Sequence, residues 1–154
     1  MTRPGLALLV CAILLMSTGC SMGQQVTGQP TRPDKTLYAR LGGYDALAAV
    51  TDDFIGRLIA DRQLSRFFTG ASTDSKKRIR QLVVDQLCAA TGGPCVYIGR
   101  DMKTSHAGLG ITESDWQVAT NHLVATLDKF KVPPREKEEV LAAVSGLKKD
   151  IVER

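Results

Sequence analysis

The chain contains few histidines and cysteines, the side chains that most often bind transition metals or carry redox chemistry. Its only histidines are His106 and His122, and only two of its four cysteines, Cys88 and Cys95, lie beyond the first twenty residues. No Cys-x-x-Cys-His, His-Glu-x-x-His or glycine-rich phosphate motif is present. The sequence therefore lacks the common catalytic constellations, and single histidines and one cysteine pair remain to be explained.

The stretch CAATGGPC, residues 88–95, places the two cysteines across a turn. Redox centres, metal sites and structural disulfides all use paired cysteines. Metal binding by this pair alone is a poor interpretation, because zinc requires four ligands and no others lie nearby in the sequence. Gly92 can adopt the left-handed conformation that closes a helix, and Pro94 stops its continuation. We therefore expect Cys88 and Cys95 to form a disulfide that staples this turn.

Spacing alone assigns no role to either histidine. A lone histidine in a helical sequence is usually structural, although imidazole is the commonest metal-binding side chain. His122 lies inside an amphipathic segment and is expected to be a partly buried helix residue.

Composition indicates a globular protein rather than a nucleic-acid-binding one. Hydrophobic residues make up 44% of the 154 positions and charged residues 23%. The net charge of +4 comes from 20 basic and 16 acidic residues spread along the chain. No block of like charges and no interleaving of aromatic and basic residues occurs, so we expect no nucleic-acid partner.

The first nineteen residues resemble a bacterial lipoprotein signal peptide. Arg3 precedes an apolar run at residues 5–16 that is too short to span a bilayer comfortably, and small residues follow it. The sequence MSTGC resembles a lipobox, which implies cleavage after residue 19 and lipidation of Cys20. Ser21 beside the lipidated position implies sorting to the outer membrane, on the periplasmic face. The alternative is an ordinary cleaved signal in which Cys20 has no role.

A polar stretch over residues 20–36, rich in glycine, glutamine and proline, is expected to be a flexible tether to one domain at residues 37–154. Cys11 would be lost with the signal and Cys20 used by lipid. The remaining two cysteines would then face an oxidising periplasm, which favours their disulfide.

From Leu37 onward apolar residues recur at spacings of three and four, without the alternation of a strand. The pattern predicts an all-α domain with about four substantial helices. Thr112 is expected to cap a helix together with Asp115. The predicted helical segments are residues 37–61, interrupted at Gly42 and Gly43, then 73–90, 112–130, and 134–151 after Pro133. Residues 73–90 are amphipathic, with an apolar face formed by Ile79, Leu82, Val83 and Leu87.

Five phrases in register resemble the group I truncated haemoglobins. They are Gly42–Gly43, Phe67–Phe68, Gly92–Gly93, YIGRDM at 97–102 and SHAGL at 105–109, within LYARLGGYDALAAVTDDFIGRLIADRQLSRFF and GGPCVYIGRDMKTSHAGLGIT. The resemblance extends from Leu37 to about Leu147. It implies a truncated globin fold, in which a two-over-two helical sandwich surrounds one haem b.

The resemblance also implies a proximal iron ligand, because the family's ligand histidine follows the YxGxxM phrase and His106 stands there. A five-coordinate haem needs one neutral imidazole, an apolar wall and a polar partner that orients the imidazole ring. The residues expected to line the haem pocket are Phe54, Ile55, Phe68, Ile79, Leu82, Val83, Leu87, Met102 and Leu109.

The expected distal side of the pocket departs from the family. Ile55 occupies the position of the family's tyrosine, and Ile79, Leu82 and Val83 occupy its polar distal positions. Gln86 is the nearest polar side chain on that face. Bound oxygen would lack a hydrogen bond worth about 0.5–1.5 kcal/mol. We therefore expect fast oxygen release and a preference shifted toward nitric oxide and carbon monoxide.

Together these features predict a haem protein that reversibly binds diatomic gases (O₂, NO, CO), in oxygen transport or in nitric oxide detoxification or sensing. Nitric oxide dioxygenase activity would require an unknown electron donor, because the chain contains no recognisable flavin or nicotinamide domain. Two alternatives remain open. One is a haem-free helical lipoprotein that acts as a partner-binding scaffold, and the other is a redox sensor in which Cys88 and Cys95 switch the haem pocket.

Overall fold

The computed structural model describes residues 36–154, which form helices and no strand. The predicted signal peptide, Cys20 and all of the predicted tether except Thr36 lie outside the described residues. Thr36 is the N-cap of the first helix. The elements are α1 (Leu37–Arg40), α2 (Gly43–Ala60), the 3₁₀ helix η1 (Ser65–Phe68), α3 (Thr73–Ala90), α4 (Met102–His106), α5 (Glu113–Lys129), α6 (Pro134–Ser145) and α7 (Lys148–Ile151).

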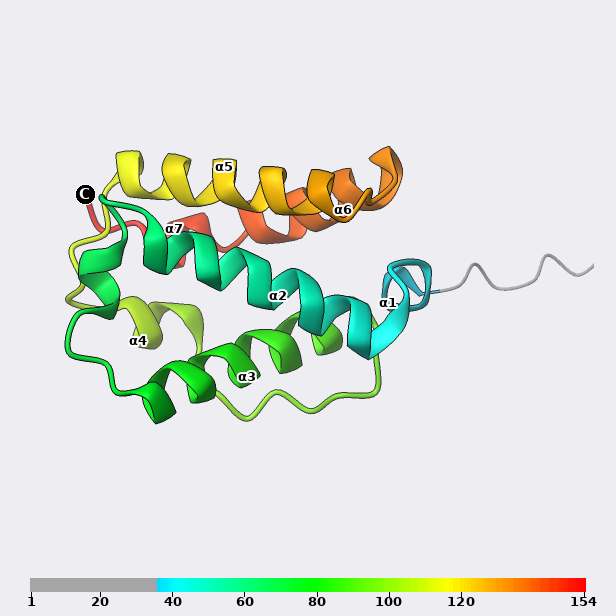
Figure 1. Ribbon diagram of the computed structural model, residues 1–154, viewed down its shortest axis with the longest axis horizontal. Coiled ribbons are helices and arrows are strands. Elements are labelled where there is room, and N and C mark those ends of the chain that lie inside the picture. Colours follow the sequence, from blue (N-terminus) through cyan, green and yellow to red (C-terminus); the bar gives the residue numbers. More distant parts are fainter. Residues whose placement is uncertain (1–35) are drawn as a thin grey trace, which may run out of the picture. The chain divides into compact units, whose positions relative to one another are not determined.

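Four of these helices form two antiparallel pairs, α2 with α3 and α5 with α6 (Figure 1). Helix α2 contacts both α3 and α5 and so joins the two pairs. This arrangement confirms the all-α, two-over-two truncated globin fold predicted from the sequence. Within residues 36–154 no helix combines the length and the apolar character needed to cross a bilayer.

A hydrophobic core lies where α5 and α6 meet α1 and α2. Leu123, Leu127 and Val140 are its buried members. Burial of a side chain of this size stabilises the folded state by about 1.5–3 kcal/mol. The partly buried residues packed against them are Leu37, Leu41, Val50, Phe54, Val132, Leu141 and Val144.

The predicted cap of the segment 112–130 is confirmed. The side chain of Thr112 accepts a hydrogen bond from the Asp115 amide, and the Asp115 carboxylate accepts one from the Thr112 amide. Two of the otherwise unpaired amides at the start of α5 are therefore satisfied locally.

The prediction of one continuous helix from Pro134 to Ile151 is wrong. Helix α6 ends at Ser145, Gly146 is its C-cap, and the short α7 begins at Lys148. Glycine disfavours a helix interior by about 1 kcal/mol relative to alanine, which makes Gly146 a suitable place for the break. Because of this break, α7 packs against α4.

The apolar face predicted for α3 is not the most buried face of that helix. The buried residues of α3 are Val84 and Cys88, whereas Ile79 is 38% exposed and Leu82 is half-buried. A single helix cannot show from its own sequence whether an apolar face meets a packed neighbour or an open cavity. On α3, Val84 and Cys88 are packed against neighbouring segments, whereas Ile79, Leu82 and Val83 line a cavity.

Candidate functional site

A cavity of about 390 Å³ opens among the helices, within the size range of small-molecule and cofactor pockets. Its lining comes from α2 to α7, from η1 and from the loops beside α4. Most of the lining side chains are apolar or aromatic. The cavity is therefore suited to a ligand with a large apolar surface.

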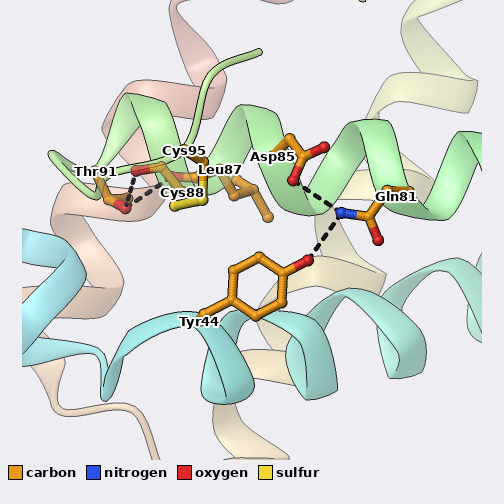
Figure 2. The surroundings of a disulfide bond; sticks show 7 residues. All are labelled: Tyr44, Gln81, Asp85, Leu87, Cys88, Thr91 and Cys95. Atoms are coloured by element: carbon orange, nitrogen blue, oxygen red, sulfur yellow. Dashed lines mark hydrogen bonds between the residues drawn. A yellow bond between two sulfur atoms is a disulfide. The ribbon is translucent and has the colours of Figure 1, made fainter. Parts of the chain in front are cut away.

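The structure brings His106 and eight of the nine predicted pocket residues to this cavity. Those eight are Phe54, Ile55, Phe68, Ile79, Leu82, Val83, Met102 and Leu109. Leu87 is not among the lining residues. It lies one turn beyond Val83 on α3, beside the Cys88–Cys95 disulfide (Figure 2).

Several lining residues were missed by the sequence analysis as pocket residues. Trp116 and Ala119 lie in the predicted helical segment 112–130 and Ile151 lies at the end of the segment 134–151. Their spacing marks them as apolar helix positions but does not separate a core from a cavity wall. The remaining additions are Leu58, Leu64, Phe67, Tyr97, Ser105, Ile111, Asp115, Thr120, Leu123 and Val144. Gln86, expected as the nearest polar side chain on the distal face, lines the cavity as well.

His106, the last residue of α4, is oriented by its own helix. Its Nδ1 lies 2.8 Å from the backbone carbonyl oxygen of Met102. A carbonyl oxygen only accepts hydrogen bonds, so Nδ1 carries the proton and donates it. In the neutral ring Nε2 then has a free lone pair, and it makes no hydrogen bond within the described part of the chain. An imidazole fixed in this way is prepared to bind a metal through Nε2.

Helix α4 begins at a strong N-cap. Asp101 accepts a hydrogen bond from the Thr104 amide at 2.7 Å and another from the Thr104 hydroxyl at 2.9 Å. These two bonds stabilise the ionised carboxylate and lower the pKa of Asp101 below its ordinary value. The cap fixes the first turn of a helix that is only five residues long.

The donor set at the cavity fits a haem better than a bare metal ion. Among residues 36–154 no group of three or more His, Cys, Asp and Glu side chains could hold a metal ion. A metal bound by His106 would therefore have to bring its other ligands. One neutral imidazole in an apolar pocket is what a haem with a single axial protein ligand requires.

The buried carboxylate of Asp115, in α5, binds residues in and just before η1, which contributes Phe67 and Phe68 to the cavity lining. Asp115 is 1% exposed, and its oxygens accept hydrogen bonds from Gln63 at 2.8 Å, Arg66 at 2.7 Å and Thr112. Burial alone would raise the pKa of Asp115, but the hydrogen bonds from Gln63 and Thr112 and the charge of Arg66 outweigh it and lower the pKa. Because Arg66 belongs to η1, this network holds Phe67 and Phe68 against the start of α5.

His122 is structural, as its position inside a helix predicted. Its Nε2 lies 2.9 Å from Asp61 at the end of α2, and His122 does not line the cavity. The hydrogen bond from His122 is the largest cause that lowers the pKa of Asp61. Asp61 also accepts hydrogen bonds from the amides of Gln63 and Leu64. The pair therefore holds the turn that follows α2.

The structure joins Cys88 and Cys95 in a disulfide with their Cα atoms 5.7 Å apart (Figure 2). Cys88 is fully buried and neither cysteine lines the cavity. Gly92 has a φ of +80°, the left-handed conformation predicted for it. At Gly93 a Cβ atom would lie 2.5 Å from the Tyr38 ring, so only glycine fits. The turn thus packs closely against α1.

Comparison with known proteins connects this fold and cavity to one family. The family model described as bacterial-like globin matches residues 36–153. The group 1 truncated hemoglobin GlbN of Mycolicibacterium paratuberculosis (strain ATCC BAA-968 / K-10) is 38% identical over 116 residues, which cover 75% of this chain and 83% of that protein. The group 1 truncated hemoglobin LI410 of Chlamydomonas moewusii is 32% identical over 139 residues, covering 88% and 79%.

Solved structures show the same similarity. The truncated hemoglobin of Tetrahymena pyriformis, Fe(III) form, has a TM-score of 0.71 at 25% identity and covers 78% of this chain and 100% of its own. The 2/2 hemoglobin of Synechococcus sp. PCC 7002, in the cyanomet state and with covalently attached heme, has a TM-score of 0.70 at 27% identity, with coverage of 77% and 99%.

Proposed function

The chain belongs to the bacterial-like globin family, and we propose that it is a haem protein that binds diatomic gases reversibly, with His106 as the protein ligand of the iron. The observation that carries this proposal is the imidazole of His106. Its Nδ1 is bound to the Met102 carbonyl and its Nε2 is free, beside an apolar cavity of cofactor size. A bound haem would supply the iron at which a gas molecule binds.

The walls of the cavity have a separate role, which is to surround the porphyrin and exclude water. Phe54 and Phe68 come from α2 and η1, Met102 and Leu109 lie on either side of His106 in sequence, and Trp116 comes from α5. Apolar walls lower the local dielectric constant and strengthen any polar contact made inside. They also favour retention of an apolar cofactor through burial of its surface.

We propose that the gas preference is shifted from oxygen toward nitric oxide and carbon monoxide. The cavity-lining residues on α2 and α3 include Ile55, Ile79, Leu82 and Val83, none of which can donate a hydrogen bond. Gln86 is the one amide side chain that α3 contributes to the lining, and it makes no hydrogen bond with the described residues. Lack of a donor at position 55 weakens retention of oxygen more than retention of the other two gases.

This preference supports a role in nitric oxide detoxification or sensing over oxygen transport. Detoxification by dioxygenation would need an electron donor of unknown identity. The lipobox-like sequence ending at Cys20 and the polar residues 20–36 support a protein tethered to the periplasmic face of the outer membrane. Radiolabelled fatty acid should be incorporated by the full chain and not by a Cys20→Ser variant. Equal labelling of both would contradict the anchor.

The ligand assignment is tested by absorption spectra of the ferric and ferrous protein after expression with added haem. We expect a Soret band in the wild type and its loss or a strong shift in His106→Ala. The matched control is His122→Ala, which removes the other histidine and should leave the band unchanged. A wild-type protein that takes up no haem would favour the haem-free scaffold, and a normal His106→Ala spectrum would remove His106 as ligand.

A further inference from the structure

The chain immediately after His106 is held by one carboxylate from the far end of the sequence. The Gly108 amide donates to Glu153 Oε1 at 2.5 Å, and the Gly110 amide donates to Glu153 Oε2 at 2.8 Å. Both glycines have a left-handed backbone, with φ of +80° and +66°. Hydrogen bonds to a charged acceptor are about twice as strong as neutral ones.

Backbone pairing extends this contact on both sides. The Glu153 amide donates to the Ile111 carbonyl at 2.8 Å, and the Glu113 amide donates to the Arg154 carbonyl at 3.0 Å. In addition, α7 packs against α4. Residues 108–113 are therefore joined to residues 153–154 by four hydrogen bonds, and the Glu153 side chain makes the two nearest to His106.

Helix α4 needs such support because it is short and none of its residues is buried. An isolated helix of one or two turns is unstable in water, since few hydrogen bonds offset the ordering of its backbone. Asp101 fixes the start of α4. At its end the chain leaves the helix at Ala107 with an extended ψ of 129°, and the Leu109 amide donates to the His106 carbonyl at 3.2 Å.

We propose that Glu153 is a positioning residue for His106. By holding the Gly108 and Gly110 amides, it fixes the backbone on the C-terminal side of His106 and so limits the orientations of the imidazole at the cavity. Glu153 does not line the cavity. The inference rests on the proposed function, because it needs His106 to bind the haem iron.

The test compares wild type, Glu153→Ala and Glu153→Gln in the haem-loaded full chain. The iron–histidine stretching band of the ferrous protein should shift or broaden in Glu153→Ala. Transfer of haem to an excess of apomyoglobin should become faster by about tenfold or more, because Glu153→Ala removes two hydrogen bonds to a charged group and tenfold is the low end of the range for one. Glu153→Gln keeps one acceptor oxygen and should fall between the other two.

A readout without haem is the amide exchange of Gly108 and Gly110, whose protection should fall in Glu153→Ala. The matched control is Lys148→Ala, which removes the exposed ion pair between Lys148 in α7 and Glu113 at the start of α5, at 2.7 Å, without touching the Gly108 and Gly110 amides. This control should keep the wild-type stretching band and transfer rate. If Glu153→Ala does not fold, as seen by circular dichroism, the comparison is made with Glu153→Gln.

The results separate this inference from the proposed function. A wild type with no iron–histidine band overturns the ligand assignment and, with it, the positioning role. A normal wild-type band that Glu153→Ala leaves unchanged, together with an unchanged transfer rate, overturns only the role of Glu153. Faster exchange of the two glycine amides with no change at the iron would show that Glu153 merely holds the end of the chain.

Discussion

The wall of the cavity formed by α2 and α3 and the wall formed by α4 are stabilised by different interactions. Helices α2 and α3 have 18 residues each. The buried residues are Leu47, Thr51 and Ile55 in α2 and Val84 and Cys88 in α3. Helix α4 has five residues and buries none. Its position depends on hydrogen bonds at its two ends and on its contact with α7.

The two kinds of interaction suit the different roles of the two walls. Packed side chains make the α2–α3 wall stable, and Gln86 is the only hydrogen-bond donor that the side chains of α2 and α3 contribute to the cavity lining. Directional hydrogen bonds on the α4 side set the tautomer and orientation of one imidazole, which burial alone cannot specify. Changes in the first wall should therefore affect stability or gas preference, and changes in the second should affect His106.

The largest effect is expected from removing packing in the α2–α3 wall. Leu47→Ala should lower the free energy of unfolding by about 2–5 kcal/mol, because Leu47 is buried and its truncation leaves a cavity. Urea denaturation measures the change. Val96→Ala is the control, since Val96 is 77% exposed and its truncation should change stability by less than about 0.5 kcal/mol. Equal effects of the two substitutions would contradict the role assigned to packing.

Removing the disulfide should have the next largest effect. The double variant Cys88→Ala, Cys95→Ala should unfold about 2–3 kcal/mol more easily in the chain-entropy description of a short loop. Neither cysteine lines the cavity, so the haem spectrum should not change. The wild type with a disulfide reductant is the parallel measurement. A spectrum that shifts on reduction would favour the redox sensor over the structural staple.

A donor placed in the first wall should change gas binding. Ile55→Tyr should slow oxygen dissociation by about two- to twelvefold, which corresponds to one hydrogen bond of 0.5–1.5 kcal/mol. Ile55→Phe adds the ring without the hydroxyl and should not slow it. Stopped-flow displacement of oxygen measures both rates. Slow oxygen release already in the wild type would contradict the apolar distal wall.

The smallest effect is expected at the start of α4 and depends on pH. The pKa of Asp101 is lowered in the folded state, so its ionised cap stabilises α4 above the unfolded pKa of about 3.9 and is lost as pH falls through the lower folded value. Amide exchange protection of Thr104 should fall over that range. Asp101→Asn keeps a capping oxygen that does not titrate, so it should lose less protection. Identical pH profiles would show that other carboxylates cause the loss.

Much of the scaffold could be predicted from local sequence patterns. The amphipathic spacing of residues 73–90, the Thr112–Asp115 cap and the left-handed Gly92 each depend on residues within about one turn of one another. The resemblance of five phrases to one family then located His106. Gly146 was not recognised as a break, because a single glycine inside a helical pattern is often tolerated.

The remaining features depend on which distant segments meet. Nothing near Leu87 shows that the cavity lining on α3 ends at Gln86 and leaves Leu87 out. Nothing near His106 shows that Glu153, 45 residues beyond Gly108, holds the next turn. Periodicity records which face of a helix is apolar, because it reflects the geometry of that helix alone. Only the tertiary structure determines whether that face meets a packed core or a cavity. The same holds for which carboxylate binds which amide. Helix content, the turn at Gly92 and the identity of the candidate ligand were thus readable from residue order, whereas the cavity wall and the support of His106 arise from long-range packing.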